Sequence, residues 1–162
     1  MTQITTLIHA TAPTENLGRT LETLRAADEV IVVNHGSDEA VTKVARQYGA
    51  RMIEGVPGVD QGAYAVNCKH DWIFCLLPNE TLSEALEASL LEWKATEPDA
   101  TKSFAVKVRE EKDGRWKNLG AETRLVNRGT VNWKEATPPP MDGAAELAGD
   151  ILRFVDVKSG PE

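Results

Sequence analysis

Apolar and polar positions follow two different orders along this chain, and the order changes after residue 95. Before that point, short apolar runs over 4–9, 29–34, 50–55 and 71–77 predict β-strands. The run EVIVVN at 29–34 is apolar at nearly every position, which is typical of a strand that helices cover on both faces. The segment 60–70 is compatible with a helix or with an irregular crossover.

Helical spacing fills the intervals between these strands. Leucines at spacings of four and three predict a helix within 15–27. Ser37 is placed to cap a helix over 38–48, and Thr81 and Glu84 have capping-box spacing that opens a helix ending near residue 95. The alternation of strands and helices predicts parallel strands joined by right-handed crossovers.

The later part of the chain has the alternating pattern of antiparallel strands. SFAVKVREE alternates, and KDGRW at 112–116 predicts a hairpin turn that leads to strands at 122–127 and 129–133. A last strand is expected over 150–157. The predicted fold class is therefore α/β, with a mostly parallel sheet flanked by helices and an antiparallel back half.

Composition narrows the class of protein. The chain has 162 residues, of which 41% are hydrophobic and 27% are charged, as in soluble globular proteins. We expect one domain over 1–157 and a flexible tail over 158–162. The net charge of -7, without a long basic cluster, argues against binding to nucleic acid.

The expected cellular location of the protein is based on patterns that the sequence lacks. No apolar stretch approaches the ~20 residues that span a bilayer, and the N-terminus does not have the pattern of a signal peptide. Cys68 and Cys75 have no CxxC spacing. We therefore expect a cytoplasmic protein with no transmembrane segment. His9, His35 and His70 share no metal-ligand spacing, and we expect His35 to be exposed.

Three segments together resemble a known family. They are EVIVVNHGSDEAVTKVARQYGARMIEG (29–55), DWIFCLLPNETLSEAL (71–86) and ETRLVNRGTV (122–131). Their order and spacing resemble the family 2 glycosyltransferases with the GT-A fold, within the nucleotide-diphospho-sugar transferase superfamily. The likeness is greatest to the branch that acts on lipopolysaccharide and other cell-envelope sugars. The resemblance implies a GT-A (Rossmann-like) fold and a nucleotide-sugar donor.

The same resemblance shows which functional positions differ here. The aspartate that holds the nucleotide base falls on Asn34, and the two metal-binding aspartates fall on Leu77 and Asn79. Of the metal motif only the following acid, Glu80, remains. The side chain of Leu77 has no ligand atom, so we expect no divalent cation and no other cofactor.

Further positions of the family pattern give the candidate binding residues. A basic residue and an asparagine of the crossover fall near Gly62 and Ala63, and the His-Glu pair that supplies the base is replaced within ATPPP (136–140). Arg124 falls on an arginine of the pattern and Glu15 lies near its early acidic residue. The resemblance thus gives four candidate substrate-binding residues, Asn34, Gly36, Glu15 and Arg124.

Three hypotheses of different classes follow. The first is a degenerate glycosyltransferase-like domain that retains at most nucleotide, sugar or partner binding. The second is an active, metal-independent transferase with Arg124 or another basic group on the diphosphate and Glu80 or Asp38 as the base. The third is an unrelated α/β interaction module. A homodimer or a protein partner is compatible with each, and Trp116, Trp133 and Phe104 are candidate contacts.

Overall fold

The computed structural model describes residues 1–10, 16–97 and 99–155. Their strands form one sheet with the order β3-β2-β1-β4-β7-β6-β8-β5. The strands are β1 (Ile4–Ala10), β2 (Glu29–Asn34), β3 (Arg51–Glu54), β4 (Trp72–Leu76), β5 (Glu80–Leu82), β6 (Ser103–Lys112), β7 (Arg115–Asn127) and β8 (Ala145–Phe154). The helices are α1 (Leu17–Glu22), α2 (Glu39–Gln47), η1 (Gln61–Asn67, a 3-10 helix) and α3 (Glu84–Ala95).

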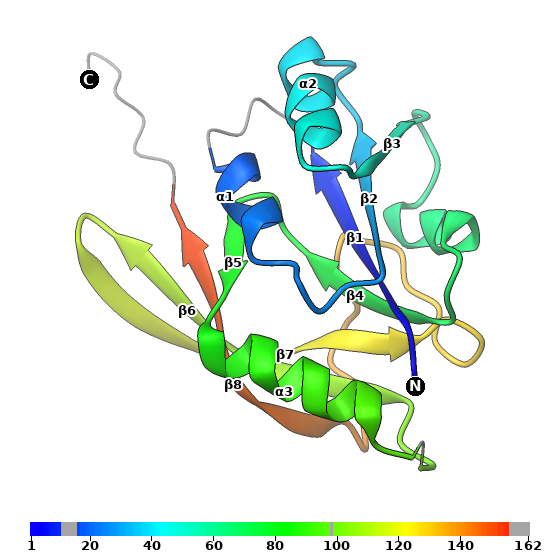
Figure 1. The fold of residues 1–162 in the computed structure, drawn as a ribbon, viewed down its shortest axis with the longest axis vertical. Coiled ribbons are helices and arrows are strands. Elements are labelled where there is room, and N and C mark those ends of the chain that lie inside the picture. The colour runs from blue at the N-terminus through cyan, green and yellow to red at the C-terminus, as the bar shows by residue number, and fades with distance from the viewer. Residues whose placement is uncertain (11–15, 98, 156–162) are drawn as a thin grey trace.

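The sheet joins a parallel half to a half that is largely antiparallel (Figure 1). β1 pairs with β2 and with β4 in parallel, and β2 pairs with β3 in parallel. β7 then pairs antiparallel with β4 and β6, while β8 runs parallel to β6 and antiparallel to β5. The predicted fold class is confirmed, and the predicted hairpin turn lies at Asp113 and Gly114, both with positive φ.

Alternation along the strands divides the core between the two faces of the sheet. In β1, Ile4 and Ile8 join the larger cluster with residues of α1, α2 and α3, and Leu7 joins the smaller cluster with Tyr64 of η1. Trp133, from the segment that follows β7, also belongs to the smaller cluster. Each face of the parallel half is thus covered, which explains the continuous apolar run of β2.

The helices differ from their predicted limits at the caps. α2 is capped by Asp38, whose carboxylate accepts a hydrogen bond from the Ala40 N–H, while Ser37 has a φ of 50°. α3 is capped by Ser83, because the predicted cap Thr81 lies in β5 and pairs with β8. In the described part of the chain no helix is both long enough and apolar enough to cross a membrane.

Three other segments differ from the predictions. The described helix within 15–27 covers only Leu17–Glu22, whereas the crossover within 60–70 contains a 3-10 helix and so agrees with one of the two forms expected for it. Residues 129–133, predicted to be a strand, have no strand pairing and contribute buried side chains instead. The last strand, predicted over 150–157, begins earlier, at Ala145, and its described part ends at Phe154, while residues 156 and 157 lie outside the described residues.

Candidate functional site

The carboxyl ends of the parallel strands define the candidate site. β1 has β2 on one side and β4 on the other, so the order of the strands changes direction between β1 and β4. In open α/β sheets, ligands bind outside the carboxyl ends of the strands at such a switch point. Asn34 ends β2, and residues 77–80 follow β4 at the same edge. Glu15 lies outside the described residues.

Asn34 is engaged in the turn that leads into α2. Its side chain is buried, and its Nδ2 donates to the carbonyl oxygen of Asp38 at 2.8 Å and to Oγ1 of Thr42 at 3.3 Å. Its Oδ1 accepts from the Asp38 N–H at 3.2 Å. Both ends of the amide are therefore bonded within the chain, which leaves the base-binding role of Asn34 a prediction that this geometry does not favour.

Replacement of Asn34 by aspartate is expected to destabilise the fold rather than to restore a base-binding residue. The aspartate carboxylate has the shape of the asparagine amide but lacks its two N–H donors, and it faces the carbonyl oxygen of Asp38. We expect this change to lower the free energy of unfolding by about 2 kcal/mol. Urea denaturation measures this loss. Asn132→Asp, at an exposed position, is the matched control and is expected to stay within about 0.5 kcal/mol of the parent protein. Equal stability of the two variants would contradict the structural role of Asn34.

The loop after β2 places the other two candidates of this turn on the surface. Gly36 is exposed, and the half-buried Asp38 uses one carboxylate oxygen to accept from the Ala40 N–H at 2.8 Å. The carboxylate of Asp38 thus stabilises the first turn of α2.

The segment after β4 is bonded to the chain itself. The N–H of Leu77 donates to Oε1 of Glu80 at 2.8 Å, and Nδ2 of Asn79 donates to the carbonyl oxygen of Phe154 at 2.8 Å. Oγ1 of Thr20, in α1, donates to the carbonyl oxygen of Pro78 at 3.0 Å. These bonds hold the exit of β4 against α1 and β8.

Glu80 and Arg124 form an ion pair with no solvent exposure at either side chain. Nη1 of Arg124 lies 2.6 Å from Oε1 of Glu80, and Nη2 lies 2.8 Å from Oε2. Nε of Arg153 donates to the same Oε2 at 3.0 Å, and Glu122 accepts from Nη2 of Arg124 at 2.9 Å. Burial by itself would raise the pKa of Glu80, but its bonds to Arg124, the Leu77 N–H and Arg153 bring the pKa below its ordinary value.

The donor set at the metal-motif positions does not fit a divalent cation. Leu77 has no ligand atom, the amide of Asn79 is bonded to Phe154, and Glu80 is enclosed by two arginines. Hard cations such as Mg²⁺ and Mn²⁺ require several oxygen ligands. Within residues 1–10, 16–97 and 99–155 no other cluster of His, Cys, Asp and Glu could hold a metal ion.

Two histidines form a pair that the sequence analysis did not predict. Nδ1 of His9 lies 2.8 Å from Nε2 of His35, and the rings are stacked with their centroids 5.1 Å apart. Tyr64 contacts both rings edge-on. His35, expected to be exposed, is half-buried, and a Cβ at Gly55 would collide with its ring. The available signal was their position, since His9 lies near the end of β1 and His35 directly follows the adjacent strand.

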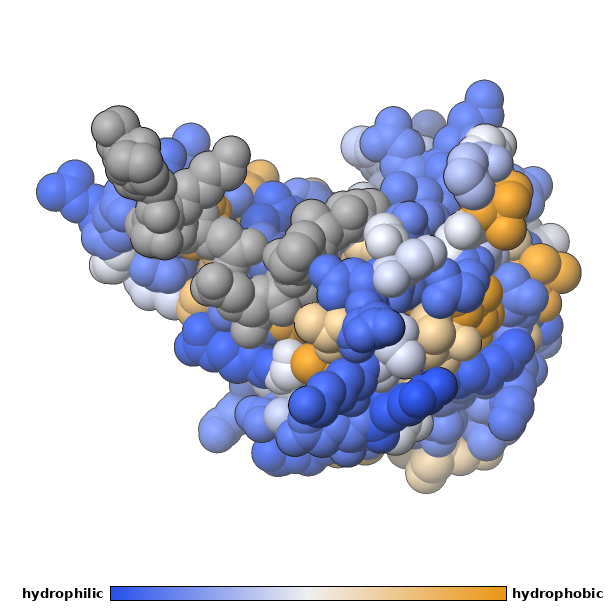
Figure 2. All heavy atoms as spheres, turned by 90° about the horizontal axis from the view of Figure 1, so that it is seen from above, coloured by the Kyte–Doolittle hydropathy of each residue, from blue (hydrophilic) through white to orange (hydrophobic). Residues whose placement is uncertain are grey.

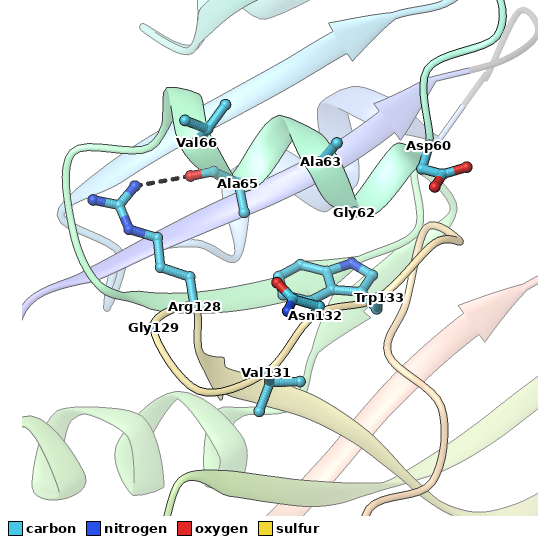
Figure 3. Close-up of a pocket in the computed structure, with 10 residues that line it drawn as sticks. All are labelled: Asp60, Gly62, Ala63, Ala65, Val66, Arg128, Gly129, Val131, Asn132 and Trp133. Atoms are coloured by element: carbon cyan, nitrogen blue, oxygen red, sulfur yellow. Dashed lines mark hydrogen bonds between the residues drawn. The ribbon is translucent and has the colours of Figure 1, made fainter.

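A cavity of about 470 Å³ lies between η1 and residues 128–133 (Figure 3). Arg128 reaches across one end, where its Nη1 donates to the carbonyl oxygen of Ala65 at 2.8 Å. Trp133 lies at the other end, and a Cβ at Gly62 would collide with its carbonyl oxygen. The back-half segment therefore occupies the space beside Gly62, the position near which the resembling family has a basic residue.

The candidate contacts for a partner differ in exposure. Trp133 and Phe104 are buried in the core of the chain itself, and Trp116 is 43% exposed beside Arg109 and Phe154. Viewed from the side on which α1 and α2 lie, the surface is mostly hydrophilic and its hydrophobic residues form small separate patches (Figure 2). Of the three aromatic candidates, Trp116 alone is left with substantial exposed surface.

Comparison with known proteins identifies solved structures that share the fold of this chain. No protein-family model matches the chain, and no curated protein sequence matches it. Among solved structures, 4-diphosphocytidyl-2C-methyl-D-erythritol synthase matches with a TM-score of 0.56 and 14% identity, over 93% of this chain and 90% of that one. Rv0371C from Mycobacterium tuberculosis, in complex with manganese, matches with a TM-score of 0.55 and 16% identity, over 94% and 91%. The chain therefore shares an α/β, Rossmann-like fold with these two proteins.

A longer enzyme shares part of this GT-A-like fold. Glucosyl-3-phosphoglycerate synthase from Mycobacterium tuberculosis, in complex with Mn²⁺, UDP and glucosyl-3-phosphoglycerate, matches with a TM-score of 0.52 and 14% identity. The match covers 68% of this chain and 44% of that one, so the chain spans less than half the length of that synthase. At these identities the likeness concerns the fold alone.

Proposed function

We propose that this chain is a degenerate domain like those of the family 2 glycosyltransferases, close to the lipopolysaccharide and cell-envelope branch. It binds a nucleoside diphosphate or a nucleotide-sugar without a divalent cation, and it does not carry out metal-dependent glycosyl transfer. The observation that carries the proposal is the buried Glu80–Arg124 pair. Glu80, the last acid of the metal motif, is paired with an arginine, whereas a metal-binding acid at this position would contact the cation.

Two further observations support the proposal. Leu77 and Asn79 stand where the resembling family has metal-binding aspartates, and Asn79 is bonded to Phe154. The fold is shared with a synthase whose solved structure contains Mn²⁺ and UDP, which supports a nucleoside diphosphate as the ligand class. The alternative of a metal-independent transferase that uses Arg124 on a diphosphate is less well supported, because that guanidinium is fully buried and paired.

Calorimetric titration tests the proposal. UDP, GDP, CDP, dTDP and their common sugar conjugates are titrated into the protein, first with Mn²⁺ and then with a chelator. We expect one nucleotide to bind with the same affinity in both conditions, because the metal-motif side chains give the cation no oxygen cage. We also expect no release of nucleoside diphosphate from the sugar conjugate when Mn²⁺ is added.

The titration has two outcomes that overturn the proposal. Binding that requires Mn²⁺ would mean that Glu80 leaves Arg124 to ligate the ion. The absence of binding for every nucleotide in both conditions would favour a domain that contacts other proteins.

A further inference from the structure

The His9–His35 pair lies outside the ion pairs around Glu80, and its chemistry is unusual for a buried site. His9 is 2% exposed, and its Nε2 has no hydrogen-bond partner among the described residues. Its other nitrogen, Nδ1, lies 2.8 Å from Nε2 of His35. A hydrogen bond between two imidazoles requires one N–H and one lone pair, so the bond itself holds one proton.

The charged groups around the pair leave it without an anionic partner. Neither imidazole forms an ion pair in the part of the chain that the structure describes. Tyr64, from η1, contacts both rings. The acids of the neighbouring elements are engaged or lie outside hydrogen-bond distance of the rings: Glu54 of β3 accepts from Ser37, Asp38 caps α2, and Asp60 precedes η1.

Burial opposes a positive charge on either imidazole. Burial lowers the pKa of His9 to about 4, with a smaller contribution from His35 that lowers it further and one from the backbone of Gln61 that raises it. Burial also lowers the pKa of His35 below its ordinary value. If one of these rings takes up a proton, the pair becomes positively charged. It could then supply at this position the charge that a bound cation would otherwise supply.

A diphosphate ligand at this edge needs such a charge. The arginines near the exit of β4 already have partners: Arg124 and Arg153 bind Glu80, and the guanidinium of Arg19 lies 4.3 Å from the centre of the Phe154 ring. In the absence of a divalent cation, a phosphate is stabilised by cationic or N–H donor groups. Among the described residues at this edge, the histidine pair can gain a charge when an anion arrives.

We infer that the His9–His35 pair takes up one proton from solvent when a nucleoside diphosphate binds at the carboxyl edge of β1 and β2. This inference rests on the proposed function and adds the source of the positive charge. The proton resides on His35, the more exposed ring. Nε2–H of His35 then donates to Nδ1 of neutral His9, so the hydrogen bond survives with one charge. A second proton, on His9, is opposed by its burial and by the charge on His35.

Calorimetry in two buffers of different ionisation enthalpy measures the proton uptake directly. We expect uptake of up to one proton per bound nucleotide, with binding that tightens by up to tenfold per pH unit as the pH falls from about 8 to about 6. NMR of the histidine side chains in the parent protein gives a second readout. Addition of the nucleotide should move the His35 signals, and not those of His70, to imidazolium values.

Three variants separate the roles of the two rings. His35→Gln is expected to abolish the pH dependence. His9→Leu removes the acceptor for His35 and is expected to flatten the pH profile, whereas His9→Gln retains an acceptor oxygen and should restore it. The matched control is His70→Gln, because His70 precedes β4 at the opposite edge of the sheet and should leave the profile unchanged.

The outcomes distinguish this inference from the proposed function. If the parent protein binds a nucleotide with the same affinity at both pH values and without proton uptake, the inference is wrong and the proposed function stands. If the parent protein binds no nucleotide at either pH, both are wrong. An unchanged pH profile in His35→Gln would also overturn the inference.

Discussion

Replacement of Arg124 by leucine is expected to lower the free energy of unfolding by about 3–5 kcal/mol, the usual cost of removing one partner from a buried ion pair. The reason is that Glu80 stays in the core with one remaining ion-pair partner, Arg153. Glu80 and Arg124 both have no solvent exposure, and two hydrogen bonds of 2.6 and 2.8 Å join them. Urea denaturation followed by circular dichroism measures the loss.

A double-mutant cycle separates the pair from the packing around it. The double variant Arg124→Leu with Glu80→Leu is expected to be more stable than Arg124→Leu alone, because it no longer buries a carboxylate whose one remaining ion-pair partner is Arg153. Arg115→Leu, at an exposed strand position, is the matched control and should change stability by about 0.5 kcal/mol or less. The interpretation of the pair fails if Arg124→Leu costs no more than Arg115→Leu.

Acid titration gives the same prediction a second readout. In the unfolded chain the Glu80 carboxyl has its ordinary pKa of 4.5, and in the folded protein its pKa is lower. The stability that the pair contributes is therefore complete above the unfolded pKa and is lost as the pH falls from 4.5 through the folded value. Glu80→Gln removes this titration, so its free energy of unfolding should depend less on pH in that range than that of the parent protein.

The alternation of strands and helices could be predicted because it depends on local periodicity. The limits of β2 agree with the run EVIVVN, since a strand covered on both faces is apolar throughout. The start of α3 could not be located as well, because Thr81 and Ser83 are both good capping residues. Only the pairing of 80–82 with 151–153, which are distant in sequence, decides between them.

The candidate site was predictable to the extent that it depends on residue identity. Leu77 and Asn79 show directly from the sequence that the metal-motif carboxylates are missing. The pairing of Glu80 with Arg124 depends on the fold, because it requires β7 to lie antiparallel beside β4. The His9–His35 contact requires the parallel register of β1 and β2, and the two residues are 26 positions apart. Contacts of this kind follow from strand pairing and have no local pattern.

Gly62→Arg, which places a basic side chain near the position of one in the resembling family, is expected to destabilise the protein by about 3 kcal/mol or more. A Cβ at this position would collide with the carbonyl oxygen of Trp133. The segment cannot shift freely, because the N–H groups of Gln61 and Gly62 both donate to the carbonyl oxygen of Lys134. Thermal and urea denaturation of Gly62→Ala measure the loss of stability caused by the Cβ atom alone. The same measurements on Gly62→Arg give the loss caused by the full side chain.

The neighbouring residue supplies the control for this prediction. Ala63 is exposed on the same turn of η1, so Ala63→Arg adds the same side chain and charge without the collision, and should change stability by about 0.5 kcal/mol or less. If Gly62→Ala is as stable as the parent protein, the segment 131–134 must move away from η1 at little cost. The space beside Gly62 would then be open to a ligand. A large loss of stability in Gly62→Ala, with none in Ala63→Arg, would instead mean that the segment 131–134 permanently fills the space beside Gly62.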